Sequence, residues 1–349
     1  MNMAAFTRQV LCWHRQFGRK DLPWQQNPTA YRVWVSEIML QQTQVATVIP
    51  YYQRFIRSFP DIASLATATG DDVLHHWSGL GYYARARNLH RTACLIRERH
   101  GGVFPNLFDE IIELPGIGRS TAGAILSLAC EQRYPILDGN VKRVLARFHA
   151  VDGWPGQPAV AKKLWALADE HTPQQDVAAY TQAIMDLGAT VCTRSSPNCN
   201  LCPLREGCSA FERDAVTRYP GRREPKKKPL RHTHMVLAHI NGAVYLERRP
   251  AKGIWGGLWS LPELADENDL HQWCEQELNA RPAGLDRWQT MRHSFTHFDL
   301  DIQPIAVRLL AQSSTVRDTE DRVWYKIGSP PPGGMAAPVS KLIQTLRNS

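Results

Sequence analysis

The chain has 349 residues, enough for two domains that each bury a core of their own. Its 41 lysines and arginines against 33 acidic residues give a formal charge of +8, which suits a polyanionic partner such as a nucleic acid. No apolar run reaches the roughly 18 residues that a membrane helix needs, and the N-terminus lacks the apolar core of a signal peptide. These features argue against a membrane-spanning or exported protein, and we expect a soluble cytoplasmic one.

The first half of the chain is dominated by apolar residues at helical spacing. We predict a short amphipathic helix from Leu11 to Phe17 and a longer helix from Tyr31 to Ile49. Two further helices flank the stretch Trp77–Asn88, where a pair of glycines predicts a turn. Tyr82 follows that turn, and with the nearby arginines it could stack on a nucleic-acid base, although aromatic residues of helical proteins more often lie in the core.

A polar stripe is expected on the longer helix. Glu37, Gln41 and Gln44 are spaced at i, i+4 and i+7, so a continuous helix would place them on one face. Polar stripes normally face water, and the spacing alone therefore favours a surface position for Glu37. The amides of Gln41 and Gln42 could instead bond base edges or enter a gap in a duplex.

The run from Leu114 to Lys142 contains a candidate phosphate-binding turn. Pro115 is expected to end one helix, and Gly116 and Gly118 permit positive φ and close approach. The first N–H groups of the following helix could then point together at an anion. A phosphate held in this way positions a nucleic acid without reading its sequence. The alternative is an ordinary turn between two helices.

Asp138 follows the candidate phosphate-binding turn and precedes a helical run from Val141 to Phe148. One interpretation is a catalytic carboxylate placed next to the bound nucleic acid. The other is a helix N-cap, which is the commonest role of an aspartate at such a position. The local sequence does not distinguish the two.

The cysteines fall into two groups. Four stand singly among apolar neighbours, as reduced packing cysteines do. The other four form one compact segment with the spacing Cys-x6-Cys-x2-Cys-x5-Cys, at Cys192, Cys199, Cys202 and Cys208. Four thiolates suit a structural zinc ion or a [4Fe–4S] cluster, and the single compact loop favours the cluster.

The basic, proline-rich run over residues 222–232 predicts a linker. Beyond it, Asn241 and Gly242 separate two strand-like runs and predict a hairpin with a type I′ turn. Further strands are expected at Trp255–Leu261, Phe295–Val307 and Arg322–Ile327, and helices at Leu270–Leu278 and the C-terminal end. This second part is predicted to be an α+β domain.

Taken together and in this order, the motifs resemble those of adenine DNA glycosylases of the MutY type, within the helix–hairpin–helix glycosylase superfamily. The similarity is densest at Val33–Tyr52, Trp77–Asn88, Leu114–Arg147 and Gln182–Cys208. The resemblance implies an all-α glycosylase domain over residues 1–221, with its helix–hairpin–helix element near 108–130 and a [4Fe–4S] loop at 192–208. It also implies a Nudix-like domain over residues 233–349 that recognises 8-oxoguanine.

The resemblance assigns Glu37 and Asp138 as the catalytic pair. Glu37, with a raised pKa in an apolar pocket, would protonate the adenine, and an ionised Asp138 would stabilise the cationic sugar. The residues implied in contacts to DNA or to the extruded base are Gln41, Gln42, Tyr82, Gly116, Gly118, Ser120, Asn140, Lys142 and Gln182. The four clustered cysteines would ligate the [4Fe–4S] cluster.

The implied reaction is hydrolysis of the N-glycosidic bond of adenine opposite 8-oxoguanine or guanine in double-stranded DNA, which leaves an abasic site. Ser120 stands where strand-cutting relatives carry the lysine that forms a Schiff base, so we expect a monofunctional glycosylase. We also expect a monomer without membrane association. Two alternatives are a bifunctional glycosylase and lyase resembling endonuclease III, and a non-enzymatic iron–sulfur protein that binds DNA.

The second domain departs from the Nudix pattern. Glu263 fits the start of the Nudix motif, but Gln276 stands where a metal-binding acid is expected, and magnesium prefers carboxylates. We therefore expect recognition and no diphosphate hydrolysis. Phe295, Thr296 and His297 correspond to the family's Phe-Ser-His loop that reads 8-oxoguanine, and on residue type alone they would be ordinary loop residues.

Overall fold

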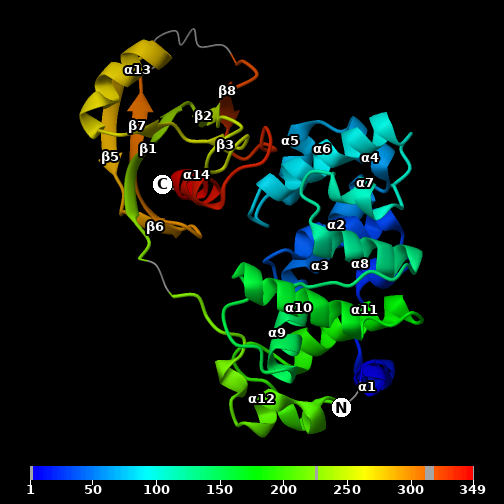
Figure 1. Cartoon of the computed structure of the whole chain (residues 1–349). Coiled ribbons are helices and arrows are strands. Elements are labelled where there is room, and N and C mark those ends of the chain that lie inside the picture. The colour runs from blue at the N-terminus through cyan, green and yellow to red at the C-terminus, as the bar shows by residue number, and fades with distance from the viewer. Residues whose placement is uncertain (1–2, 225–226, 311–317, 349) are drawn as a thin grey trace. The chain divides into compact units, whose positions relative to one another are not determined.

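The computed structural model describes residues 3–224, 227–310 and 318–348. They form two compact units, one from the described parts of Met1–Thr67 and Asn88–Pro225, the other from those of Ala68–Arg87 and Lys226–Ser349 (Figure 1). The segment Ala68–Arg87 thus groups with the second unit, which a division of the sequence at the linker does not anticipate. No helix in the described ranges combines the length and apolarity needed to cross a membrane.

The first unit is helical, as its apolar spacing predicts. Its main elements are α1 (Met3–Phe17), α2 (Ala30–Leu40), α3 (Val45–Ser58), α4 (Ile62–Thr67), α7 (Phe108–Ile112), α8 (Arg119–Cys130), α9 (Gly139–Phe148), α10 (Pro158–His171), α11 (Val177–Asp186) and α12 (Ser209–Glu212). The helix α6 (Ala84–Arg99) begins in the second unit and continues into the first. Apolar faces of α1, α9, α10 and α11 share one core, in which Phe6, Leu145 and Ile184 are buried. Burial of these faces supplies the main stabilisation of the helices.

The predicted continuous helix from Tyr31 to Ile49 is wrong. The helix α2 ends at Leu40, and Gln42 adopts a positive φ of 56° in the turn before α3. The N–H of Thr43 donates to the carbonyl of Leu40 over 3.2 Å and closes that turn. Because the chain changes direction here, Glu37 and Gln44 do not share one helical stripe. The apolar spacing continued across the turn only because both helices pack on the core.

The candidate phosphate-binding turn joins α7 and α8. Gly116 has a φ of 83°, which favours glycine, and a Cβ at this position would lie only 3.0 Å from the Cβ of Asn88. Gly118 was expected to share the positive φ, but its φ is −99° and it serves as the extended N-cap of α8. The hydroxyl of Thr92 donates to the carbonyl of Pro115 and fastens the turn to α6.

The second unit contains a mixed sheet with the order β3-β2-β1-β7-β5, and β4, β6 and β8 pair with β1, β7 and β2. The strands are β1 (Leu230–Ile240), β2 (Ala243–Arg248), β3 (Trp259–Ser260), β4 (Glu263–Leu264), β5 (Pro282–Arg287), β6 (Met291–Ser294), β7 (Asp299–Leu309) and β8 (Arg322–Lys326). β1 runs parallel to β7, and it begins at Leu230 inside the predicted linker. Its first three side chains are exposed, which is why no apolar pattern marked this start.

The predicted hairpin is confirmed by pairing of Ile240 with Ala243, with positive φ at Asn241 and Gly242. The helix α13 (Leu270–Leu278) has the predicted bounds, and its buried Cys274 shares a core with one sheet face. The described part of this unit also contains α5 (Gly70–Trp77) and α14 (Ala337–Asn348). The expected α+β architecture is therefore present in the described part of the second unit, although the Trp255–Leu261 run forms only a two-residue strand.

Candidate active site

The first unit contains a cavity of about 670 Å³, within the range of ordinary ligand sites. It lies among α2, the turn after α2, α8, α9 and α11. Seven of the residues singled out in the sequence line it, namely Glu37, Gln41, Gln42, Ser120, Asp138, Asn140 and Gln182. Two acids that are far apart in the sequence, Glu37 and Asp138, therefore face one cavity.

Glu37 lies in the last turns of α2, between buried Ser36 and Ile38. Burial, and to a smaller extent the negative charge of Asp138, raises the pKa of its carboxyl to about 8. A carboxyl with this pKa holds its proton at neutral pH. Such a group can act as a general acid, which an ordinary surface glutamate cannot do.

Asp138 is both an N-cap and a cavity residue, so the two interpretations of this aspartate are compatible. Its Oδ1 accepts the N–H of Val141 over 2.8 Å at the start of α9, and its Oδ2 accepts the amide of Asn140 over 2.9 Å. Burial raises the pKa of Asp138, and these two bonds with the charge of Arg143 oppose that rise. Each of the opposing contacts favours the carboxylate form.

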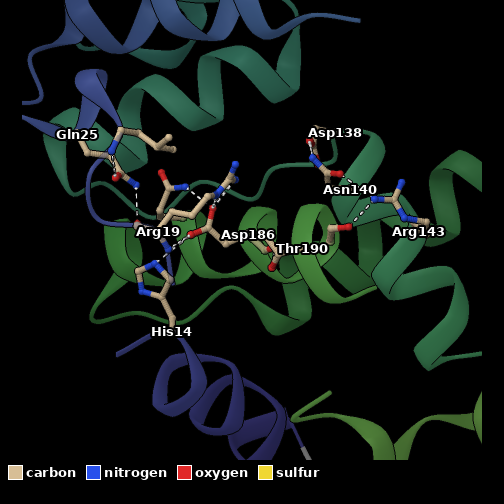
Figure 2. A network of polar contacts seen from close by, with 11 residues as sticks. His14, Arg19, Gln25, Asp138, Asn140, Arg143, Asp186 and Thr190 are labelled. Carbon is tan, nitrogen blue, oxygen red and sulfur yellow. Dashed lines mark hydrogen bonds and ion pairs between the residues drawn. The ribbon is translucent and has the colours of Figure 1, made fainter. Parts of the chain in front are cut away.

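Arg143 holds Asn140 in place (Figure 2). Its Nη2 donates to Oδ1 of Asn140 over 2.8 Å and to the carbonyl of Gly188 over 2.6 Å, and its Nε donates to the carbonyl of Cys192 over 2.6 Å. The amide group of Asn140 therefore has its oxygen toward Arg143 and its nitrogen toward Asp138. A chain of hydrogen bonds links the first clustered cysteine to the acid at the cavity.

Ser120, in the first turn of α8, also acts on the segment that carries Asp138. Its Oγ accepts the N–H of Leu137 over 3.0 Å. This bond joins the helix after the candidate phosphate-binding turn to the residue before Asp138. The hydroxyl thus has a positioning role in addition to its place in the cavity wall.

Three other predicted DNA contacts of the first unit lie outside the set of described residues that line the cavity. Gly116 and Gly118 are exposed at the start of α8, and Lys142 is partly exposed on α9. These positions are compatible with contacts to a phosphate backbone, which lies outside a base pocket.

The predicted reader loop lies in the second unit. Phe295, Thr296 and His297 connect β6 to β7, and the N–H of Phe295 donates to the carbonyl of Phe298 over 2.9 Å. Thr296 and His297 are exposed, while Phe295 contacts neighbouring aromatic rings. The hydroxyl of Tyr82, which is 46% exposed, lies 3.5 Å from that of Thr296. Two residues predicted to touch DNA are therefore neighbours.

Glu263 of the Nudix-like motif forms an ion pair with Arg249. A guanidinium bound to this carboxylate competes with a divalent cation for the same oxygens. That this unit recognises a ligand and does not hydrolyse diphosphates stays a prediction.

Cys192, Cys199, Cys202 and Cys208 line one small pocket, together with Arg147. The Nη1 of Arg147 lies 3.3 Å from the sulfur of Cys192, and the carbonyl of Arg147 accepts from Cys208. Among the described residues no three potential ligands are arranged around a single metal ion. In a four-iron cube each thiolate binds a different iron, so its four sulfurs stand farther apart than the ligands of one ion.

Sequence reasoning missed the residues that hold the cavity residues in place. Arg143 lies three positions after Asn140 on α9, and Asp186 lies four positions after Gln182 on α11. Both spacings place side chains on one face of a helix, and they could have indicated polar pairs. Arg19, which binds Asp186, carried no local signal.

Comparison with known proteins defines the class of this fold and site. Residues 35–170 match the family described as HhH-GPD superfamily base excision DNA repair protein, and residues 233–345 match the NUDIX domain. A solved thermostable thymine-DNA glycosylase shares the fold of the helical part, with a TM-score of 0.54 and 24% identity over 60% of this chain and 97% of that chain.

Similar proteins of known activity define the family within this class of DNA repair proteins. The adenine DNA glycosylase of Buchnera aphidicola (strain APS) is 39% identical over 350 residues, covering 100% of this chain and 99% of the relative. The human adenine DNA glycosylase is 32% identical, covering 89% of this chain and 68% of the relative. The chain belongs to the adenine DNA glycosylase family, and the resemblance seen in its sequence motifs is confirmed.

Proposed function

We propose that this protein hydrolyses the N-glycosidic bond of adenine paired with 8-oxoguanine or guanine in double-stranded DNA and leaves an abasic site. One observation carries the proposal: Glu37 and Asp138 face one cavity, and the pKa of Glu37 is raised to about 8. An adenine inside a duplex is out of reach, so it must rotate out of the helix to enter such a cavity.

The two carboxyl groups have different protonation states and different roles in the proposed reaction. Burial raises both pKa values, but Asp138 receives donors from Val141 and Asn140, and we therefore assign the proton to Glu37. Glu37 donates this proton to a ring nitrogen of adenine, which makes the base a better leaving group as the bond to the sugar breaks. The carboxylate of Asp138 stabilises the positive charge that develops on the sugar.

Water completes the reaction. It adds to the sugar carbon, and its released proton returns to the carboxylate pair, which regenerates the protein. Ser120 has no amine to form a Schiff base, and its hydroxyl accepts from Leu137. These features support a monofunctional glycosylase over a glycosylase and lyase of the endonuclease III kind.

We assign the four clustered cysteines to a [4Fe–4S] cluster. The support is their shared pocket beside Arg147 and their compact spacing. The cluster would hold the loop over residues 192–208 against α9, which carries Asn140 and Arg143. Iron and acid-labile sulfide in a ratio near one, at about four of each per chain, is the expected composition.

The loop containing Phe295, Thr296 and His297 is our candidate for reading 8-oxoguanine. Its exposed hydroxyl and imidazole are suited to hydrogen bonds with a base edge, and the neighbouring Tyr82 offers a ring for stacking. Thr296→Ala should lower the preference for A·8-oxoguanine over A·G duplexes. Equal losses on both duplexes would instead indicate a general role in binding.

The proposed activity is tested with a labelled duplex that contains one adenine opposite 8-oxoguanine, with and without alkali after incubation. Strand scission that depends on alkali is the expected result, because a monofunctional glycosylase leaves an intact abasic strand. Scission without alkali would support the bifunctional alternative. Binding with no scission under either condition would support the non-enzymatic alternative.

A further inference from the structure

The hydrogen bonds around Gln182 extend past the cavity wall. Gln182 lies on α11 and lines the cavity, and its Nε2 donates to Oδ1 of Asp186 over 2.8 Å. Asp186 is one turn further along the helix and is completely buried. It therefore acts on the cavity only through the side chains that it binds.

The carboxylate of Asp186 accepts several hydrogen bonds (Figure 2). Arg19 donates its backbone N–H to Oδ2 over 2.8 Å, and its Nε and Nη2 to Oδ1 over 2.9 and 2.5 Å. The Nε2 of His14 lies 3.5 Å from Oδ2. Burial raises the pKa of Asp186, but the contacts from His14, Arg19 and Gln182 outweigh that effect and leave the pKa below its ordinary value. The group is a carboxylate, which accepts hydrogen bonds and donates none.

An acceptor at this position determines the orientation of the Gln182 amide. Its NH₂ end must face Asp186, because the carbonyl end would meet a carboxylate oxygen. The carbonyl oxygen is then the end directed at the cavity. An amide oxygen accepts from the exocyclic amine of adenine, whereas guanine carries an oxygen at the corresponding position and would be repelled.

We propose that Asp186 is a positioning residue for substrate choice: it fixes the side-chain amide of Gln182 so that the cavity presents a hydrogen-bond acceptor to the amino group of the extruded adenine. This inference rests on the proposed function. It adds a physical reason why the cavity would prefer adenine, with its exocyclic amine, to guanine, which carries an oxygen at that position. The carboxylate of Asp186 also accepts the N–H of Arg19, and the carbonyl of Arg19 accepts from Gln25. These bonds join the cavity wall formed by residues 19–25 to α11.

The test compares single-turnover base release from two duplexes that differ only at the target base, adenine or purine, each opposite 8-oxoguanine. Purine lacks the exocyclic amine. For each variant, the rate with adenine is divided by the rate with purine, and this ratio is compared with that of the wild-type protein. The comparison cancels the intrinsic difference between the two leaving groups and any loss of activity that affects both duplexes equally. Gln182→Met and Asp186→Ala should each lower the adenine preference by about 2- to 10-fold, the value of one neutral hydrogen bond.

The double variant should lose no more preference than either single variant, because both substitutions remove the same contact. Asp186→Asn keeps an acceptor oxygen for Arg19 and Gln182 and should retain most of the wild-type ratio, which gives a folded reference if Asp186→Ala is unstable. Thr190→Val is the matched control. It removes a hydroxyl that donates to the backbone carbonyl of Asp186 and leaves the carboxylate intact, so the ratio should not change.

An unchanged ratio in Asp186→Ala, with a reduced ratio in Gln182→Met, would overturn the positioning role. An unchanged ratio in Gln182→Met would overturn the contact itself. These outcomes differ from failure of the proposed function, in which the wild-type protein releases neither base.

Discussion

The side-chain amide of Asn140 donates to Oδ2 of Asp138 over 2.9 Å, and its oxygen accepts from Arg143. The bond favours the ionised form of Asp138, so its removal should raise the pKa of that acid. In the proposed reaction Asp138 works as an anion, and activity is lost as the pH falls through its pKa. The acidic limb of the rate profile therefore reports directly on this contact.

Asn140→Ala should slow adenine release at neutral pH by about 10-fold, because one hydrogen bond to a charged group is lost. The acidic limb of the pH profile should also move to higher pH. Single-turnover rates across the acidic range measure both effects. A uniform decrease in rate without a shifted limb would show that Asn140 acts on the fold and not on Asp138.

The raised pKa of Glu37 predicts the alkaline limb. The general acid must be protonated, so adenine release should decline as the pH rises through about 8. The measurement is the single-turnover rate over the alkaline range, with DNA binding followed in parallel to separate chemistry from affinity. A rate that stays constant well above this pH would contradict the assignment of the proton to Glu37.

The same shift predicts a stability effect. The folded pKa of about 8 lies above the ordinary value of 4.5, so between these limits the folded protein binds more protons than the unfolded chain, and stability falls as the pH rises. Glu37→Gln cannot ionise and escapes this loss. The Tm of the variant minus that of wild type should grow from about pH 5 to about pH 8. A constant difference would contradict the shift.

Ser120 has a structural contribution that can be measured apart from catalysis. Ser120→Ala removes the acceptor for the N–H of buried Leu137 and should lower the free energy of unfolding by about 1–3 kcal/mol. Ser120→Thr keeps the hydroxyl and is the control. Denaturant unfolding measures both. Equal stability of wild type and Ser120→Ala would show that the N–H finds another partner.

Arg147 forms hydrogen bonds with the loop that carries the clustered cysteines and holds it against α9. It is 2% exposed, and its guanidinium donates to the carbonyls of Thr193, Arg194, Val216 and Tyr219. Arg147→Met leaves these carbonyls without their donor and should cost at least about 3 kcal/mol of stability. The iron content of the purified variant should fall with it.

Arg218→Met is the matched control for this substitution. Arg218 forms an exposed ion pair with Asp152, and such pairs contribute little. Its unfolding free energy and iron content should stay close to those of wild type. Similar losses in both variants would show that charge removal, and not the buried contacts of Arg147, causes the effect.

Local signals were sufficient where one short segment determines the structure. Asn241 and Gly242 predicted the hairpin, and the helix α13 has the predicted bounds because its apolar residues repeat every turn. The break after Leu40 was missed because neither glycine nor proline marks it. The strand β5 was missed because most of its side chains are exposed and show no alternation.

Local sequence signals were not sufficient to predict the candidate active site. Spacing alone favoured a surface position for Glu37, and only the resemblance paired it with Asp138, because packing of α2 against α8 brings distant segments together. Arg143, Asp186 and Arg19 were missed for a related reason. Their importance comes from which groups they face in the folded chain, and no motif records those contacts.

The most direct test of the account compares wild type with Glu37→Gln in single-turnover release of adenine from an A·8-oxoguanine duplex at neutral pH. The variant keeps the size of the side chain and loses the acidic proton, so release should fall by about 100-fold or more while the Kd for the duplex stays close to that of wild type. Release at the wild-type rate by the folded variant would contradict the proposal that Glu37 is the acid at this cavity.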